Sequence, residues 1–117
     1  MNESLSREYK LKSKKLIGNL FDEGKVVKAF PVLLKYNTSQ KTNLEFKVGF
    51  SVSKKNFKRA VDRNRIKRLL REYFRKNKEE FLNEEFTCVF MFIYTGKTLP
   101  VYADIEKAMK KIALKLK

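Results

Sequence analysis

The clearest hydrophobic pattern in the chain is an alternation of apolar and other side chains over residues 44–53. Apolar side chains occupy every second position, and polar residues or glycine fill the positions between them. The apolar set is Leu44, Phe46, Val48, Phe50 and Val52. Because successive side chains of a strand point to opposite faces, this period of two predicts a strand with one covered and one open face. Residues 86–95, FTCVFMFIYT, are almost continuously apolar, which favours a strand in the interior of a sheet.

A third strand is predicted over residues 26–36, VVKAFPVLLKY, which are rich in strand-forming side chains. Pro31 lacks the N–H that a sheet ladder requires, so this segment is expected to be an edge strand or a bulged strand. Residues 37–43, NTSQKTN, are polar and predict a turn region.

Three further segments carry apolar residues at helical spacing. The first begins near Ser13, a capping residue, and ends at Gly24. The second lies within residues 54–80, and its apolar stripe is Ile66, Leu69, Leu70, Tyr73 and Phe74. The third follows Pro100, and its stripe is Tyr102, Ile105, Met109, Ile112, Ala113 and Leu116.

The predicted order of elements is therefore helix, strand, strand, helix, strand, helix. This order predicts an α+β fold, a two-layer α-β sandwich in which helices pack on a small mixed sheet. A length of 117 residues fits one domain, residues 1–117, in which residues 1–12 are a flexible basic arm.

The net charge of the chain limits the classes of partner that it can bind. The chain carries 28 Lys and Arg against 13 Asp and Glu, a formal net charge of +15, with ten Phe and five Tyr. Such an excess attracts polyanions: nucleic acid, an anionic membrane surface or an acidic protein. Basic residues interleaved with aromatics around a normal core favour nucleic acid. The chain has no signal-peptide character and no apolar run long enough to span a membrane, so a cytoplasmic location is expected.

The residues that usually carry catalysis are scarce. The chain has no histidine, so it lacks the commonest general base and the commonest transition-metal ligand. Its single cysteine excludes an internal disulfide. We expect no catalytic residue and no metal site in the protein, and any chemistry in which it takes part is expected to be carried by a partner.

The candidate binding motif is the segment from Lys54 to Lys76, KKNFKRAVDRNRIKRLLREYFRK. At about 100° per residue, an arc opposite the apolar stripe carries Asn64, Arg65, Arg68, Arg71 and Arg75, with Arg63 and Lys67 at its margins. Arginine dominates this arc, and its planar fork binds phosphate oxygens in pairs and stacks on bases. The arc is therefore a candidate RNA-binding face.

The block RNRIKRLLREYFR, preceded by VGFSVSKKNFKRAVD, resembles the signature of the bacterial ribonuclease P protein component. The similarity extends to the first predicted helix, KLKSKKLIGNLFDEG. The resemblance implies an α-β sandwich with a left-handed crossover between parallel strands. It also implies a large catalytic RNA as partner, removal of the 5′ leader of precursor tRNA, and magnesium held mainly by that RNA rather than by the protein.

Carried over by this resemblance, the residues expected to face the catalytic RNA are Lys54, Lys55, Arg59, Arg63, Asn64, Arg65, Lys67, Arg68 and Arg71, and Arg75 joins them from the helical arc. The resemblance also implies a cleft for the single-stranded 5′ leader of precursor tRNA. Its expected walls are Ile17, Phe21 and the strand around Leu34 to Tyr36, with Lys35 and Tyr36 as the contacts from that strand, and Phe50 is expected on its floor.

Other functions compete with this one. A structural RNA-binding protein of the ribosomal type fits the size, charge and fold class equally well and lacks only the signature block. A DNA-binding role for the basic helix lacks helix-turn-helix spacing or a dimer zipper. A membrane-surface helix would need the apolar face that the predicted strands require for the core. The strand GFSVS also lacks the paired aromatics of single-strand-binding sheets.

Overall fold

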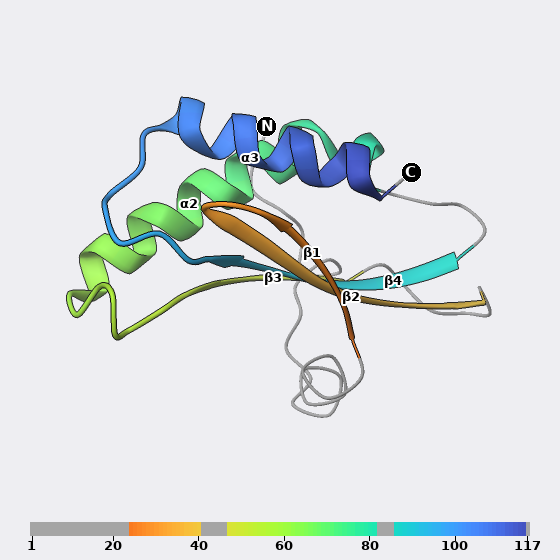
Figure 1. Ribbon diagram of the computed structural model, residues 1–117, viewed down its shortest axis with the longest axis horizontal. Helices are drawn as coiled ribbons and strands as arrows, with labels where there is room; N and C mark the ends of the chain where they lie inside the picture. The colour runs from red at the N-terminus through yellow and green to blue at the C-terminus, as the bar shows by residue number, and fades with distance from the viewer. Residues whose placement is uncertain (1–23, 41–46, 82–85, 117) are drawn as a thin grey trace, which may run out of the picture.

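The computed structural model describes residues 24–40, 47–81 and 86–116 (Figure 1). Within them, one four-stranded sheet has the order β1-β2-β4-β3. Its strands are β1 (Lys25–Ala29), β2 (Val32–Gln40), β3 (Lys47–Val52) and β4 (Phe86–Tyr94). Strands β1, β2 and β4 pair antiparallel, whereas β3 pairs with β4 in parallel. The sheet is therefore mixed, as the sequence predicts.

Two helices cover one face of this sheet. Helix α2 (Ala60–Lys76) and the short 3-10 helix η2 (Lys78–Glu80) connect β3 to β4, and α3 (Tyr102–Lys115) follows β4. Figure 1 shows α2 and α3 lying over the same side of the strands, so the predicted two-layer α+β class is confirmed. The parallel β3-α2-β4 crossover is the connection that the resemblance implies, and its left-handed sense stays a prediction. The predicted arm and first helix lie outside the described residues.

The segment predicted as a single strand at residues 26–36 is instead a hairpin. Strands β1 and β2 pair up to Ala29 and Val32, and Phe30 and Pro31 form the turn through a cis peptide bond. The Pro31 carbonyl accepts hydrogen bonds from the Thr95 backbone N–H at 2.7 Å and from its hydroxyl at 3.1 Å. Because Pro31 has no N–H to donate to the sheet, it lies in the turn that separates β1 from β2.

The predicted turn at residues 37–43 is also partly wrong. Residues 37–40 continue β2, where Asn37 to Gln40 pair with Val89 to Phe86 of β4. Polar side chains do not prevent pairing here, because the long apolar strand β4 offers a complete row of backbone partners. The alternating strand is confirmed over Lys47–Val52, and residues 44–46 lie outside the described part.

The core lies between the sheet and the two helices. Both predicted helical stripes face it. Their half-buried members, which are Leu69 of the α2 stripe and Tyr102 and Leu116 of the α3 stripe, pack against the buried core. The fully or almost fully buried side chains of this layer include Val32, Leu34, Val48, Val52, Phe90, Phe92 and Tyr94 from the sheet, Ile66, Leu70, Tyr73 and Phe74 from α2, and Ile105, Met109 and Ile112 from α3. Central strand β4 also buries Met91 on its other face, which explains its unbroken apolar sequence.

Among the described helices, none is long and apolar enough to cross a membrane.

Candidate nucleic-acid interface

The outward surface at the start of α2 and in the loop before it is strongly basic. The turn after β3 exposes Lys54 and Lys55, and the residues leading into α2 expose Lys58 and Arg59. The first three turns of the helix expose Asn64, Arg65 and Arg68. We call this set the α2 basic strip: Lys54, Lys55, Lys58, Arg59, Asn64, Arg65 and Arg68.

The helical part of the α2 basic strip surrounds an open hollow of about 660 Å³. The described residues that line it include Arg59, Asn64, Arg65 and Arg68, and Asp62 is the single carboxylate among them. Asp62 lies in the first turn, where a negative side chain suits the helix dipole. The hollow therefore presents three guanidinium groups and one amide, which are donor groups that match phosphate and ribose oxygens.

Arg63 is only half-exposed, and part of its guanidinium is engaged within the protein. Its Nη1 donates to the carbonyl oxygens of Phe57 at 2.7 Å and Lys58 at 2.9 Å. The Phe57 side chain is buried, and its N–H donates to the Ser53 carbonyl at 3.1 Å. Arg63 thus fastens to α2 the loop that carries the lysines of the α2 basic strip. An additional contact between Arg63 and RNA stays a prediction.

Arg71 and Arg75 do not lie on the exposed arc that the helical wheel predicts. The Arg71 guanidinium carbon lies 5.6 Å from the centre of the Phe50 ring. Arg75 has a side chain only 19% exposed, and it forms an ion pair with Glu72 at 2.6 Å. The wheel treats the helix as isolated, whereas a neighbouring strand and an intrahelical carboxylate hold these side chains. Lys67 is half-buried.

The electrostatics of this helix end follow from the same contacts. The hydrogen bond from Arg75 and the charges of Arg75 and Lys76 lower the pKa of Glu72, although burial opposes the shift. Glu72 therefore stays ionised at neutral pH. It neutralises part of the charge at the C-terminal end of α2, so the net positive surface is concentrated at the N-terminal end.

The residues predicted for the leader cleft do not share one face of the sheet. Tyr36 packs edge-on against Phe90, and Phe50 stacks on Phe92 and meets Phe74 of α2. Both aromatics therefore lie on the helix-covered face, where each is half-buried, and their role in a leader cleft stays a prediction. Lys35, next to Tyr36 in β2, points to the opposite face because side chains alternate along a strand. Ile17 and Phe21 lie outside the described residues.

Sequence analysis missed one member of the α2 basic strip. The Lys58 side chain is exposed in the loop just before α2, and the Lys58 carbonyl is one of the two to which Arg63 donates. Its place in the run of cations before α2 was a sufficient signal. Within residues 24–40, 47–81 and 86–116, no three His, Cys, Asp or Glu side chains gather in a way that could hold a metal ion.

The fold and its exposed surface define a class: an α+β domain in which one helix packs its apolar side into the core and exposes arginines to solvent on the other side. Comparison with known proteins specifies that class. Residues 5–117 match the family model described as Ribonuclease P.

Two curated relatives carry the name ribonuclease P protein component. The one from Porphyromonas gingivalis strain W83 is 32% identical over 96% of this chain and 85% of its own. The one from Borreliella burgdorferi strain ZS7 is 36% identical over 93% of this chain and 90% of its own. The structure of the Staphylococcus aureus RNase P protein is similar with a TM-score of 0.73 at 25% identity, covering 92% of this chain and 94% of that chain. The Thermotoga maritima protein shares the fold with a TM-score of 0.74 at 19% identity.

The chain belongs to the ribonuclease P protein family, whose members are the protein components of the ribonucleoprotein endoribonuclease ribonuclease P.

Proposed function

We propose that this protein binds the catalytic RNA of ribonuclease P through the α2 basic strip and promotes removal of the 5′ leader from precursor tRNA. The observation that carries the proposal is the sorting of α2 into two sides. Ile66 and Leu70 are fully buried in the core, while Arg65 and Arg68 of the same two turns face solvent. A surface with this many exposed guanidinium and ammonium groups is suited to a phosphate backbone.

The α2 basic strip would act by neutralising phosphates and by fixing the protein's orientation on RNA. Arginine forks at residues 59, 65 and 68 would pair with phosphate oxygens, and the Asn64 amide would contact a ribose hydroxyl or a base edge. Binding is then strongly salt-dependent. Four or more phosphate contacts correspond to a log-log slope of about −3 or steeper, at roughly −0.7 to −0.9 per contact.

We further propose that the single-stranded leader runs along the sheet face opposite α2 and α3. Lys35 of β2 points to this face, as Lys28 of β1 and Lys47 of β3 do by strand alternation. Three lysines over three strands give a positive field along a path suited to an extended strand of RNA. Tyr36 and Phe50 have no part in this path.

The protein would contribute positioning and electrostatic stabilisation, not proton transfer. The chain has no histidine, and its described part offers no metal-binding cluster. Catalytic magnesium would be held mainly by the RNA, with the protein strengthening its occupancy by orienting the two RNA strands nearby. The active site of the assembled enzyme would then lie in the RNA.

The test is cleavage of a 5′-extended precursor tRNA by bacterial ribonuclease P RNA at low, near-physiological magnesium. Addition of the protein should restore cleavage, and the protein alone should give none. Absence of rescue, together with tight binding to another structured RNA, would replace this function with the ribosomal-type alternative.

Two variants of equal charge separate specific contact from bulk electrostatics. Arg65→Ala with Arg68→Ala removes two cations from the α2 basic strip, and Lys25→Ala with Lys110→Ala removes two exposed cations from β1 and α3. The first pair should weaken binding of the catalytic RNA and lessen rescue much more than the second. Equal loss from both pairs would show that net charge, not the α2 basic strip, drives association.

A further inference from the structure

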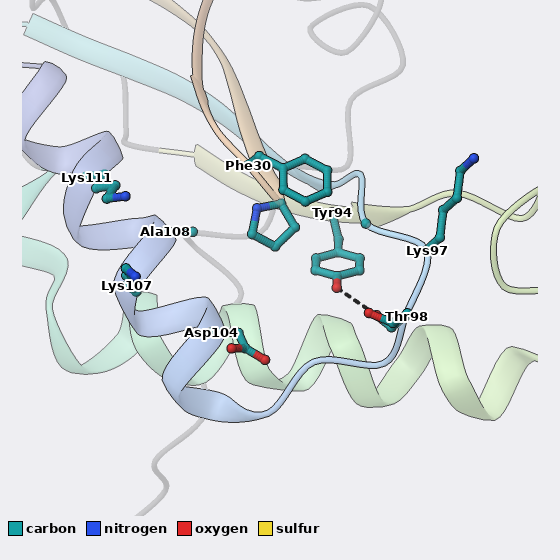
Figure 2. Close-up of a pocket in the computed structure, with 10 residues that line it drawn as sticks. Phe30, Tyr94, Lys97, Thr98, Asp104, Lys107, Ala108 and Lys111 are labelled. Carbon is teal, nitrogen blue, oxygen red and sulfur yellow. Dashed lines mark hydrogen bonds between the residues drawn. The ribbon is translucent and has the colours of Figure 1, made fainter.

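A second basic hollow lies away from the helical part of the α2 basic strip, between the β1–β2 turn and the start of α3. Its volume is about 350 Å³, within the range of pockets that hold small ligands. Figure 2 shows the Phe30–Pro31 turn on one side, α3 on the other, and the segment after β4 closing the end. The lining residues that the argument uses are Phe30, Tyr94, Lys97, Asp104, Lys107 and Lys111.

The floor of this hollow is rigid. The Tyr94 side chain is buried, and its hydroxyl donates to the Thr98 carbonyl at 2.7 Å. Gly96 packs so closely that an added Cβ would lie 2.6 Å from the Tyr94 hydroxyl oxygen and 3.1 Å from the Pro31 Cβ. The bonds from Thr95 to the Pro31 carbonyl fasten the turn to the same segment. The hollow is therefore preformed, with little ordering cost on binding.

Phe30 is the most exposed of the large apolar side chains in the described residues, at 81%. A phenyl ring in a tight turn gains almost nothing in stability from such exposure, since hydrophobic stabilisation depends on removing apolar surface from water. The ring stands at the mouth of a fixed hollow, as Figure 2 shows. It offers a flat apolar platform of the kind on which nucleobases stack.

The charge of the hollow selects an anionic ligand. Lys107 and Lys111 lie one turn apart on α3, and Lys97 stands on the opposite side (Figure 2). Among the described residues that line the hollow, the only carboxylate is Asp104, whose Oδ2 accepts the Val101 N–H at 3.0 Å and so caps the start of α3. Three ammonium groups around an aromatic platform can contact the phosphates on either side of a stacked base.

We propose that this hollow is a second RNA site that takes one unpaired nucleotide of a single-stranded segment. Its base stacks on Phe30 and its flanking phosphates contact Lys97, Lys107 and Lys111. An acidic peptide would use the lysines but would leave Phe30 without a reason for its position. The proposal goes beyond the function above, because it involves none of the residues of the α2 basic strip and none of the lysines of the opposite sheet face.

A fluorescent reporter can test the stacking directly. The chain contains no tryptophan, so Phe30→Trp in the full-length protein creates a single indole at the mouth of the hollow. Because residue 30 is exposed, this change should leave the melting temperature within about 2 °C of the wild type. Stacking of a base should quench the indole saturably when oligouridylate or oligoadenylate of about six nucleotides is added.

Matched variants assign the effect to this hollow. Lys107→Gln with Lys111→Gln, in the Phe30→Trp protein, should raise the apparent Kd at least about fivefold and lower the salt slope by about 1.4, at roughly 0.7 per single-strand phosphate contact. Lys110→Gln, an exposed lysine of the same helix outside the hollow, should change the Kd less than twofold. Arg65→Ala with Arg68→Ala should leave the quenching amplitude unchanged, which separates this site from the α2 basic strip.

The ligand controls decide between stacking and simple charge attraction. An abasic oligonucleotide of equal length and a poly-glutamate peptide should give no saturable quenching. Oligonucleotide binding detected by anisotropy without quenching, or equal quenching by the abasic strand, would overturn the proposal. If Phe30→Trp fails to fold, Phe30→Leu in the unlabelled protein gives a second measurement. A fluorescein-labelled oligonucleotide should bind to this variant about fivefold more weakly than to wild type. Unchanged affinity would also overturn the proposal.

Discussion

Arg63 and Arg65 are two positions apart in the same motif, and their replacement should have different consequences. Arg63 donates to the Phe57 and Lys58 carbonyl oxygens, whereas Arg65 is exposed beside the hollow of the α2 basic strip. We predict that Arg63→Ala lowers stability and loosens the loop before α2. Arg65→Ala should weaken RNA binding without a change in stability.

The loss of stability expected for Arg63→Ala follows from the two hydrogen bonds of Arg63, at 2.7 and 2.9 Å. A hydrogen bond to a charged group contributes about 1.5 to 3 kcal/mol when it is well protected from water. The bond to Phe57 is part-buried and the bond to Lys58 is exposed, so we expect a combined loss of about 2 kcal/mol. In a domain of this size that loss corresponds to a decrease in Tm of roughly 6–12 °C.

Arg65→Ala should change the affinity for RNA rather than the stability of the fold. An exposed surface substitution changes the free energy of unfolding by about 0.5 kcal/mol or less. Loss of one phosphate contact should make the log-log salt dependence less steep by roughly 0.7 to 0.9. If that contact contributes about 1 kcal/mol, the affinity for the catalytic RNA falls about fivefold.

Three assays together test this pair. Thermal unfolding gives the stability difference, and amide hydrogen exchange reports whether the Phe57 N–H, bonded to Ser53 at 3.1 Å, exchanges faster in Arg63→Ala. Titration of the catalytic RNA at several salt concentrations gives the affinity and its slope. If Arg63→Ala keeps wild-type stability and wild-type exchange, Arg63 does not hold the loop before α2. A large decrease in Tm for Arg65→Ala would show that Arg65 does not lie on a solvated surface.

Three further predictions concern stability. Gly96→Ala should cost about 1–3 kcal/mol, measurable as a lower Tm, because the new Cβ would lie 2.6 Å from the buried Tyr94 hydroxyl oxygen. Glu72 pairs with Arg75, and its lowered pKa stabilises the fold at pH values above the ordinary value of 4.5. Wild type should therefore be more stable than Glu72→Gln by less than about 1 kcal/mol at neutral pH, and the difference in Tm should disappear as pH falls below 4.5. Burial, and after it the hydrogen bond to the Glu80 carboxylate, raises the pKa of Tyr73. The unfolded chain therefore loses the Tyr73 phenol proton at a lower pH than the folded chain does. The free energy of unfolding should decrease as pH rises above 10, and it should decrease less steeply in Tyr73→Phe.

The parts of the fold that the sequence predicts correctly are those with local periodicity. The alternation through Val48 and Val52 and the stripe from Ile66 to Phe74 each repeat often enough to identify an element and its buried side. The hairpin at Phe30 and Pro31 was missed because strand-forming residues continue without a break on both sides of the proline. Whether such a proline bulges one strand or separates two depends on pairing with residues far away in the chain.

The candidate site shows the same limit at the level of side chains. The helical arc correctly places Arg65 and Arg68 in solvent, because no other part of the described chain covers their side of α2. It misplaces Arg71, which lies against Phe50 of strand β3, and Arg75, which pairs with Glu72 of the same helix. Alternation puts neighbouring strand residues on opposite faces, but only the position of the helices decides which face is covered.

Two of the three proposed RNA-binding surfaces, the α2 basic strip and the hollow beside Phe30, are held by one connected set of contacts. The loop before α2 is fastened to the helix by Arg63, and the Asn56 amide of that loop donates to the Gly96 carbonyl at 3.3 Å. Gly96 in turn packs on Pro31, so the loop lysines of the α2 basic strip and the Phe30 turn are joined through one short series of contacts. Rigid attachment preserves the spacing between the two surfaces, so an RNA that fits both would be bound without the ordering cost of a flexible link.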